Sequence, residues 1–491
     1  MSQLSDTTVA PGAARSAADV AAAHATLRLT LPDRLRLLVI LAGAFMVVLD
    51  FFIVIVALPS IARDIAATPG QLQLVVAGYG IANAAGLIAG GKLGDLFGRR
   101  RLFLIGMALF GATSIACGLA TSGLALVVLR FAQGASGSLL HPQVLALLGL
   151  NFPGARRARA FAAYAMAMGL AGVMGQLLGG ALIEVNLAGT GWRSCFFINA
   201  PIALAACLLG AQLLERDAPA ATTRQIDVWG MVLTATSLTC LILPLTYGRE
   251  ALPLSTNVAL VGVAALLALA FLGTQRRRAA GGLAVMIPPS LFATPQFRLG
   301  VATVLVFYGG IASFYFVLGL HLQSTLGASA LGSGTVFAVL GAAFFAASMS
   351  GGQVGRLLKR PLVELGALVL AAGHLLQLVV AARAGSVAAM LLPLAVEGVG
   401  IGLVMAPLVS LALARVPAQH AGVAAGVLST MQSTGNALGV AGVGLFYLAG
   451  LWVAPGAHRD HGRFAEALLL LTALALLVAL LAGRIRRSQA A

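Results

Sequence analysis

Long apolar runs, separated by short polar segments, repeat along nearly the whole chain. A helix needs about 20 apolar residues to cross the hydrocarbon core of a bilayer, so each run predicts one membrane-spanning helix. The pattern predicts fourteen spans, near residues 36–58, 73–91, 102–121, 124–148, 159–183, 195–214, 228–247, 256–275, 299–322, 332–353, 362–382, 386–412, 421–450 and 465–483. The predicted fold class is therefore an all-α polytopic membrane protein with 14 transmembrane helices.

Composition and charge agree with this prediction. Residues of the chain are 60% hydrophobic and only 9% charged, whereas about a quarter of the residues in a soluble domain are charged. With the N-terminus in the cytoplasm, 24 of the 31 lysines and arginines fall on the cytoplasmic side, six fall outside and Arg130 lies within a span. Cytoplasmic loops are rich in basic residues, so the net charge of +16 reflects membrane topology and not nucleic-acid binding. We expect a multi-pass protein of a bacterial inner (cell) membrane with both termini in the cytoplasm.

Sequence patterns typical of catalysis or of cofactor binding are missing. The chain has no nucleophile elbow, phosphate-binding loop or zinc-binding pattern. Its four cysteines lie in or beside apolar spans without metal-ligand spacing, which predicts buried core residues. We therefore expect no enzymatic activity, no cofactor and no metal site. If the protein is a transporter, we expect an ion gradient to supply its energy. The alternative is a membrane receptor or scaffold that transports nothing.

Two charged residues lie deep inside predicted spans, Asp50 in the first and Arg130 in the fourth. A charged side chain at the centre of a membrane helix costs ~2.5–3.5 kcal/mol on insertion scales, so each charge needs a partner. At ~1.5 Å per residue the two lie at similar depths toward the outer face. This predicts that Asp50 and Arg130 interact, directly, through Gln133 or through water. The pair would serve either as a proton-binding site or as a static structural ion pair.

Two polar residues of the second span are candidates for a substrate cavity. Tyr79 and Asn83 are four residues apart and therefore share one face of a helix. We expect them to line a central cavity together with Asp50 and Gln133. Ordinary hydrogen bonds between helices are the alternative.

Glu397 is the second acid within a predicted span, near the midplane of the twelfth. We expect it to face the substrate cavity, where it and Asp50 would attract cations. The alternative is a structural pair with His374 in the eleventh span, or with Gln432 or Asn436 in the thirteenth.

A basic segment at residues 91–101 joins the second and third spans. We expect a short loop in which Gly91 lets two helix ends approach closely and Gly98 permits a sharp turn. Asp95 offers a hydrogen-bond acceptor, and Arg99 and Arg100 begin a cationic cluster at the membrane edge.

This segment resembles the loop between helices 2 and 3 of the major facilitator superfamily, except that Leu96 replaces a basic residue. The resemblance implies a gate latch formed by the segment, in which Asp95 pairs with a neighbouring helix in the outward-facing state. An anchor that only fixes the topology is the alternative.

Three other segments, residues 47–61, 129–137 and 192–201, resemble signatures of the fourteen-helix drug:proton antiporters of that superfamily. In the first, Phe52 and Ile55 replace the polar residues of the signature. The resemblance implies that Arg130 tunes the protonation of Asp50.

Residues 171–180 resemble the helix 5 signature that separates antiporters from symporters. Gly175, Gly179 and Gly180 match it and predict a flat helix face for close packing. Gln176 replaces the proline of the signature, so a kink is not expected from the sequence.

The resemblance divides the chain into residues 1–35, a cytoplasmic tail; 36–215, an N-terminal six-helix half; 216–296, two inserted helices and a cytoplasmic loop; and 297–491, a C-terminal six-helix half. It implies a monomeric, proton-coupled exporter of hydrophobic, cationic or amphipathic compounds. A proton-coupled importer or a lipid or glycolipid exporter of the same fold is the alternative.

Overall fold

The computed structural model describes residues 30–152, 155–215, 227–246, 253–283, 285, 289–358, 361–383, 386–414, 416, 421–451 and 461–490. Within these residues the chain is helical and contains no strand. The first half comprises α2 (Leu31–Asp64), α3 (Pro69–Phe97), α4 (Arg99–Gly118), α5 (Gly123–Asn151), α6 (Ala155–Val185), the short turns η1 (Leu187–Gly189) and η2 (Gly191–Arg193), α7 (Ser194–Phe197) and α8 (Asn199–Leu213). The rest comprises α9 (Val228–Thr246), α11 (Leu254–Ala280), η3 (Pro289–Ala293), α12 (Pro295–Leu320), the π-helical turn η4 (His321–Thr325), α13 (Ala330–Leu358), α14 (Leu362–Ala382), α15 (Val387–Leu413), α16 (Ala421–Leu451) and α17 (His461–Ala490).

The fourteen predicted spans are confirmed as fourteen helical segments of the described chain, with α7 and α8 together forming one. Eleven of them are long and apolar enough to cross a bilayer. The protein is a multi-pass membrane protein. Residues 1–29 of the predicted tail lie outside the described residues, and α2 already begins at Leu31, inside the range assigned to the tail.

Local sequence explains where the first two helices begin. Thr30 and Asp33 form a capping box at the start of α2, and Thr68 and Gln71 form one at the start of α3. In each box the threonine side chain accepts a hydrogen bond from a free backbone N–H of the first turn.

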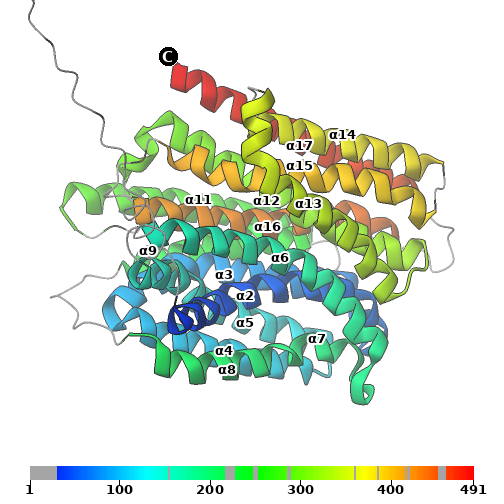
Figure 1. The fold of residues 1–491 in the computed structure, drawn as a ribbon, viewed down its shortest axis with the longest axis horizontal. Coiled ribbons are helices and arrows are strands. Elements are labelled where there is room, and N and C mark those ends of the chain that lie inside the picture. Colours follow the sequence, from blue (N-terminus) through cyan, green and yellow to red (C-terminus); the bar gives the residue numbers. More distant parts are fainter. Residues whose placement is uncertain are drawn as a thin grey trace, which may run out of the picture.

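Two six-helix halves pack side by side, with one inserted pair of helices between them in sequence (Figure 1). Helices α2 to α8 contact one another in the first half, and α12 to α17 do so in the second. The halves meet mainly where α6 packs on α13 and where α3 packs on α16. The inserted helices pack on each other, and α9 also contacts α3 and α16. The arrangement is therefore 6+2+6.

The start of α2 and the end of α17 lie at the same end of the bundle, here called the terminal end (Figure 1). The halves touch near the opposite, far end. Gln323 of η4 donates a hydrogen bond of 3.0 Å to the backbone oxygen of Val56 in α2. A Cβ atom at Gly180 of α6 would lie 2.3 Å from the backbone oxygen of Ala330 in α13. These contacts close the far end between the halves.

The expected loop at residues 91–101 is wrong in extent. Helix α3 continues through Gly91 to Phe97, and α4 begins at Arg99. Gly98 alone separates the helices, with a φ of 97° that only glycine adopts readily. Helices α3 and α5 pack closely here: a Cβ atom at Gly94 would lie 2.0 Å from Oε1 of Gln143, so the small residue leaves room for that side chain.

Candidate functional site

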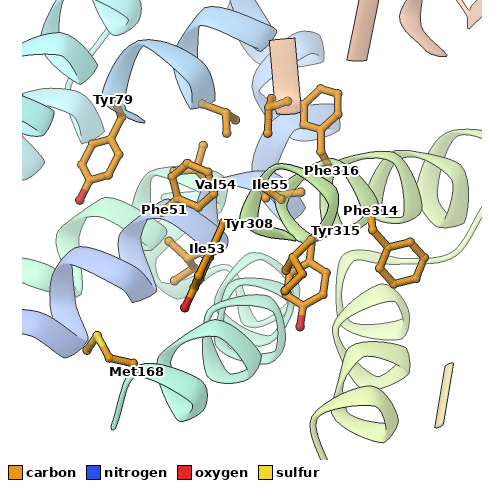
Figure 2. Close-up of a cluster of buried hydrophobic side chains, with 14 of the residues drawn as sticks. Phe51, Ile53, Val54, Ile55, Tyr79, Met168, Tyr308, Phe314, Tyr315 and Phe316 are labelled. Atoms are coloured by element: carbon orange, nitrogen blue, oxygen red, sulfur yellow. The ribbon is translucent and has the colours of Figure 1, made fainter. Parts of the chain in front are cut away.

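A cavity of about 830 Å³, including its open part, lies between the halves near the middle of the bundle. Its aromatic lining residues are Phe51, Phe52, Tyr79, Tyr308, Tyr315 and Phe344. Its polar lining residues, apart from the tyrosines, are Asn83, His141, Gln432, Ser433 and Asn436. Figure 2 shows Phe51 of α2, Met168 of α6 and two tyrosines of α12 gathered where the halves meet. None of the described lining residues is Asp, Glu, Lys or Arg.

The predicted contact between Asp50 and Arg130 is present, and both side chains are fully buried. Nη1 of Arg130 donates a hydrogen bond to Oδ2 of Asp50 and a second one, of 2.7 Å, to Oε1 of Gln133. Nε2 of Gln133 in turn donates to Oδ1 of Asp50 over 2.8 Å. The carboxylate of α2 is therefore held by two side chains that lie one turn apart on α5.

Arg130 has further partners that fix its position. Its Nε donates to the backbone oxygen of Val75 over 2.8 Å, and its guanidinium carbon lies 4.2 Å from the ring centre of Tyr79. A cation over an aromatic face in a dry site gains about 2 kcal/mol, which partly replaces lost hydration. The remaining nitrogen, Nη2, has no hydrogen-bond partner among the described residues.

Tyr79 stands between the cavity and the buried charges. It lines the cavity, its ring lies against Arg130, and its hydroxyl donates a hydrogen bond of 2.8 Å to the backbone oxygen of Val47. Tyr79 and Asn83 thus lie on the cavity wall, whereas Asp50 and Gln133 lie behind it.

Asn199 is a member of this network that sequence reasoning missed. Its Nδ2 donates to Oδ1 of Asp50 over 2.7 Å and to Oγ of Ser114 over 3.0 Å. Ser114 continues the chain with a 2.8 Å hydrogen bond to the backbone oxygen of Phe196. The sequence does carry a signal for it, because Asn199 is the polar residue within the otherwise apolar segment Phe196-Phe-Ile-Asn-Ala-Pro201.

Glu397 lies outside the described lining of the central cavity and is fully buried in the C-terminal half. Its Oε1 lies 3.0 Å from Nδ1 of His374. Of the partners weighed from the sequence, the structure selects His374, whereas Gln432 and Asn436 line the cavity.

The glycines of α6 pack as the flat face predicted from the sequence. Cβ atoms at Gly175 and Gly179 would each lie 3.0 Å from a backbone oxygen of α2. Gly180 makes the close approach to α13 described above. Gln176 lies on the same helix, which runs unbroken from Ala155 to Val185, and its buried side-chain amide has no hydrogen-bond partner among the described residues.

The predicted latch segment is held to its own half at the terminal end. Arg100 donates a hydrogen bond to the backbone oxygen of Ala211, and Arg36 donates one of 2.8 Å to that of Leu213. Both arginines bind the last carbonyls of α8, where the helix dipole favours positive charge. Arg99 begins α4, and the side chain of Asp95 lies outside the described residues.

The model of the Major Facilitator Superfamily matches residues 40–440. Three curated proteins are similar over most of the chain. The "Probable actinorhodin transporter" of Streptomyces coelicolor is 37% identical, over 86% of this chain and 74% of the relative. The "Tetracenomycin C resistance and export protein" of Streptomyces glaucescens is 32% identical, over 83% and 75%. The "Multidrug resistance protein Stp" of Mycobacterium tuberculosis is 31% identical, over 87% and 79%.

Solved structures support the fold. The crystal structure of the POT family transporter PepTSo aligns with a TM-score of 0.66, 14% identity, and coverage of 92% of this chain and 98% of that one. The partially occluded, inward-open structure of the xylose transporter XylE from E. coli aligns with a TM-score of 0.60, 13% identity, and coverage of 91% and 96%.

Proposed function

Because the chain belongs to the Major Facilitator Superfamily, we propose that it is a secondary transporter that exports aromatic, antibiotic-like compounds from bacterial cells in exchange for protons. The observation that carries this proposal is a cavity with aromatic walls beside a buried carboxylate–arginine pair. The names of the relatives in the genus Streptomyces, which refer to actinorhodin and tetracenomycin C, support this class of substrate.

The lining of the cavity favours uncharged aromatic substrates over cations. Tyr308, Tyr315 and Phe344 offer ring faces to a flat aromatic compound. Asn83, Gln432 and other amide or hydroxyl groups offer hydrogen bonds to phenol and carbonyl oxygens. Asp50 and Glu397, which were expected to attract cations, lie behind the wall.

Asp50 is the proposed proton carrier. Arg130 and two amide side chains stabilise its charged form, whereas the dry surroundings favour the protonated form. A change in hydration would therefore move the proton on or off. Substrate entering the cavity would displace Tyr79, admit water and release a proton.

Alternating access is the proposed mechanism, in an inner membrane with both termini in the cytoplasm. The halves touch at the far end, which supports a state that faces the cytoplasm. To face outward, the contacts of Gln323 and Gly180 would open and the terminal end would close. The segment around Asp95 and Gly98 lies at that end and would hold it closed.

Transport into inside-out vesicles tests the proposal. Vesicles with an acidic interior, with and without the protein, would receive a dihydroxyanthraquinone as the uncharged aromatic probe and ethidium as the cationic probe. We expect the protein to drive accumulation of the dihydroxyanthraquinone and an uncoupler to abolish it. Accumulation of ethidium alone would contradict the substrate class. Uptake of either dye that persists after the gradient is collapsed would contradict proton exchange, and uptake favoured by the opposite gradient would indicate import.

A further inference from the structure

Glu397 and His374 form a buried acid–base pair that the Asp50 network does not use. We propose that this pair is a second proton-binding site, loaded and emptied through the central cavity, so that two protons are exchanged for each substrate. The proposal rests on the export function proposed above and adds a second proton to its cycle.

The geometry of the pair suits it to hold a proton. Glu397 of α15 and His374 of α14 are both buried, and Oε1 and Nδ1 lie 3.0 Å apart. A protonated ring beside a carboxylate and a neutral ring beside a carboxylic acid both make this hydrogen bond and leave the pair neutral. A neutral ring beside a carboxylate also makes it, but that arrangement leaves a net negative charge in a buried site, which is costly. The two helices pack closely at this point, because a Cβ atom at Gly373 would lie 2.5 Å from Cγ of Glu397.

The described surroundings contain no second charge that could replace this proton. From α12, the Tyr315 hydroxyl interacts electrostatically with Glu397, and the Phe314 ring lies 5.0 Å from the His374 ring. From α13, Leu340 and Ala343 approach α15 beside Glu397. From α17, the residues near His374 are apolar: Leu471, Leu474, Ala475 and Val478. Loss of the proton would leave a net negative charge in an apolar site, so the proton stays until water enters.

A second cavity beside His374 offers a route for that water. This cavity, of about 290 Å³, is lined by His374 and by residues of α12, α15 and α17. Ile311 and Ile401 line both this cavity and the central one. The two cavities are thus neighbours, and movement of these two isoleucine side chains would be needed to join them.

Unpartnered polar groups mark the place that water would occupy. Oε2 of Glu397 is buried without a hydrogen-bond partner among the described residues. So is the whole side-chain amide of Gln377, which is fully buried on α14 one turn from His374. Buried polar groups are normally paired with protein or water, so these atoms point to a hydrated state in another part of the cycle.

The proton-to-substrate ratio tests the proposal. Proteoliposomes with the purified protein would carry a pH gradient that opposes a gradient of dihydroxyanthraquinone. Ethidium would replace this dye if the wild type carries only ethidium. The gradient of pH at which net dye flux reverses gives the ratio. We expect about two for the wild type and about one for Glu397→Gln. His321→Gln is the matched control, since His321 is another buried histidine of the C-terminal half, hydrogen-bonded to Tyr447; it should keep the wild-type ratio.

The outcomes separate this proposal from the one it rests on. A wild-type ratio of one, or the same ratio in the wild type and Glu397→Gln, would overturn the second site. A wild-type flux that ignores the pH gradient would overturn proton exchange itself. If Glu397→Gln does not fold, the wild-type ratio alone decides.

Discussion

The two buried acids, Asp50 and Glu397, are equally hidden from solvent but are neutralised in different ways. Asp50 accepts hydrogen bonds from three side chains, of which Arg130 carries a full positive charge. Glu397 has one titratable partner, His374, and an oxygen without any. The first acid is balanced by a permanent charge, and we propose that the second is balanced by a proton. We therefore expect the two acids, buried to the same degree, to exchange protons in different ways.

This difference has a consequence for how each site responds to water. At Asp50, water competes with a charge that never leaves, so the carboxylate can stay ionised once hydrated. At Glu397, water must carry the proton away before a charge appears. We expect each acid to contribute one proton to the cycle, Asp50 beside a fixed positive charge and Glu397 through its pair with His374.

The largest effect is expected from Asp50→Asn. The amide keeps the shape and hydrogen bonds to Arg130 but cannot lose a proton, so accumulation of dihydroxyanthraquinone driven by acid should fall at least 100-fold. Exchange of labelled for unlabelled dye without a gradient should persist. Vesicle uptake measures both, and coupled accumulation near the wild-type rate would contradict the role of Asp50.

Arg130→Met should impair transport nearly as much as Asp50→Asn. Its cause is a loss of folding stability, which can be measured separately from transport. The substitution leaves the Asp50 charge alone in the interior, and breaking a buried ion pair in this way costs about 3–5 kcal/mol. The variant should unfold at a lower temperature in detergent, whereas the double variant Asp50→Asn, Arg130→Met should recover most of that loss. No recovery in the double variant would show that Arg130 acts apart from Asp50.

Asn199→Ala should have an intermediate effect, seen as a shift in the pH dependence of export. Asn199 donates a hydrogen bond to the charged carboxylate, and a bond to a charged group contributes about 1.5–3 kcal/mol. Its loss makes Asp50 hold its proton more firmly, so the export optimum should move to higher pH by about one unit. Asn199→Asp is not a suitable control because it adds charge; Ser114→Ala, one step further away, should shift the optimum less.

Tyr79→Phe should have the smallest effect, about two- to threefold on transport rate. It removes the hydrogen bond to Val47 but keeps the ring against Arg130 and the cavity. Tyr79→Ala removes the ring, so protons should leak across the membrane even without substrate. Vesicles loaded with a pH dye would measure this leak. Equal leak in the two variants would contradict the separating role of the ring.

Much of the fold could be predicted from the sequence, because length and apolar composition identify membrane helices. The contact of Asp50 with Arg130 followed from depth and from the cost of isolated charges. The extent of α3 did not, since Gly91 and Gly94 are also typical of loops, whereas in the structure both belong to α3 and lie near Pro142 and Gln143 of α5.

The rest of the site depends on facts that a linear pattern does not contain. Asn199 reaches Asp50 because α8 begins beside α2 and α4, which spacing along the chain cannot reveal. For Glu397 the sequence allows three partners. It pairs with His374 because α14 packs closely on α15 at Gly373. The sequence pattern likewise does not show that both acids lie behind the cavity wall.

The most direct test is to count the protons released when substrate binds. Purified protein in weakly buffered detergent solution would be mixed with dihydroxyanthraquinone while pH and bound dye are recorded. We expect the wild type to acidify the solution and Asp50→Asn to release about one proton fewer per dye bound. Equal release by both proteins, at equal dye binding, would contradict proton exchange at Asp50.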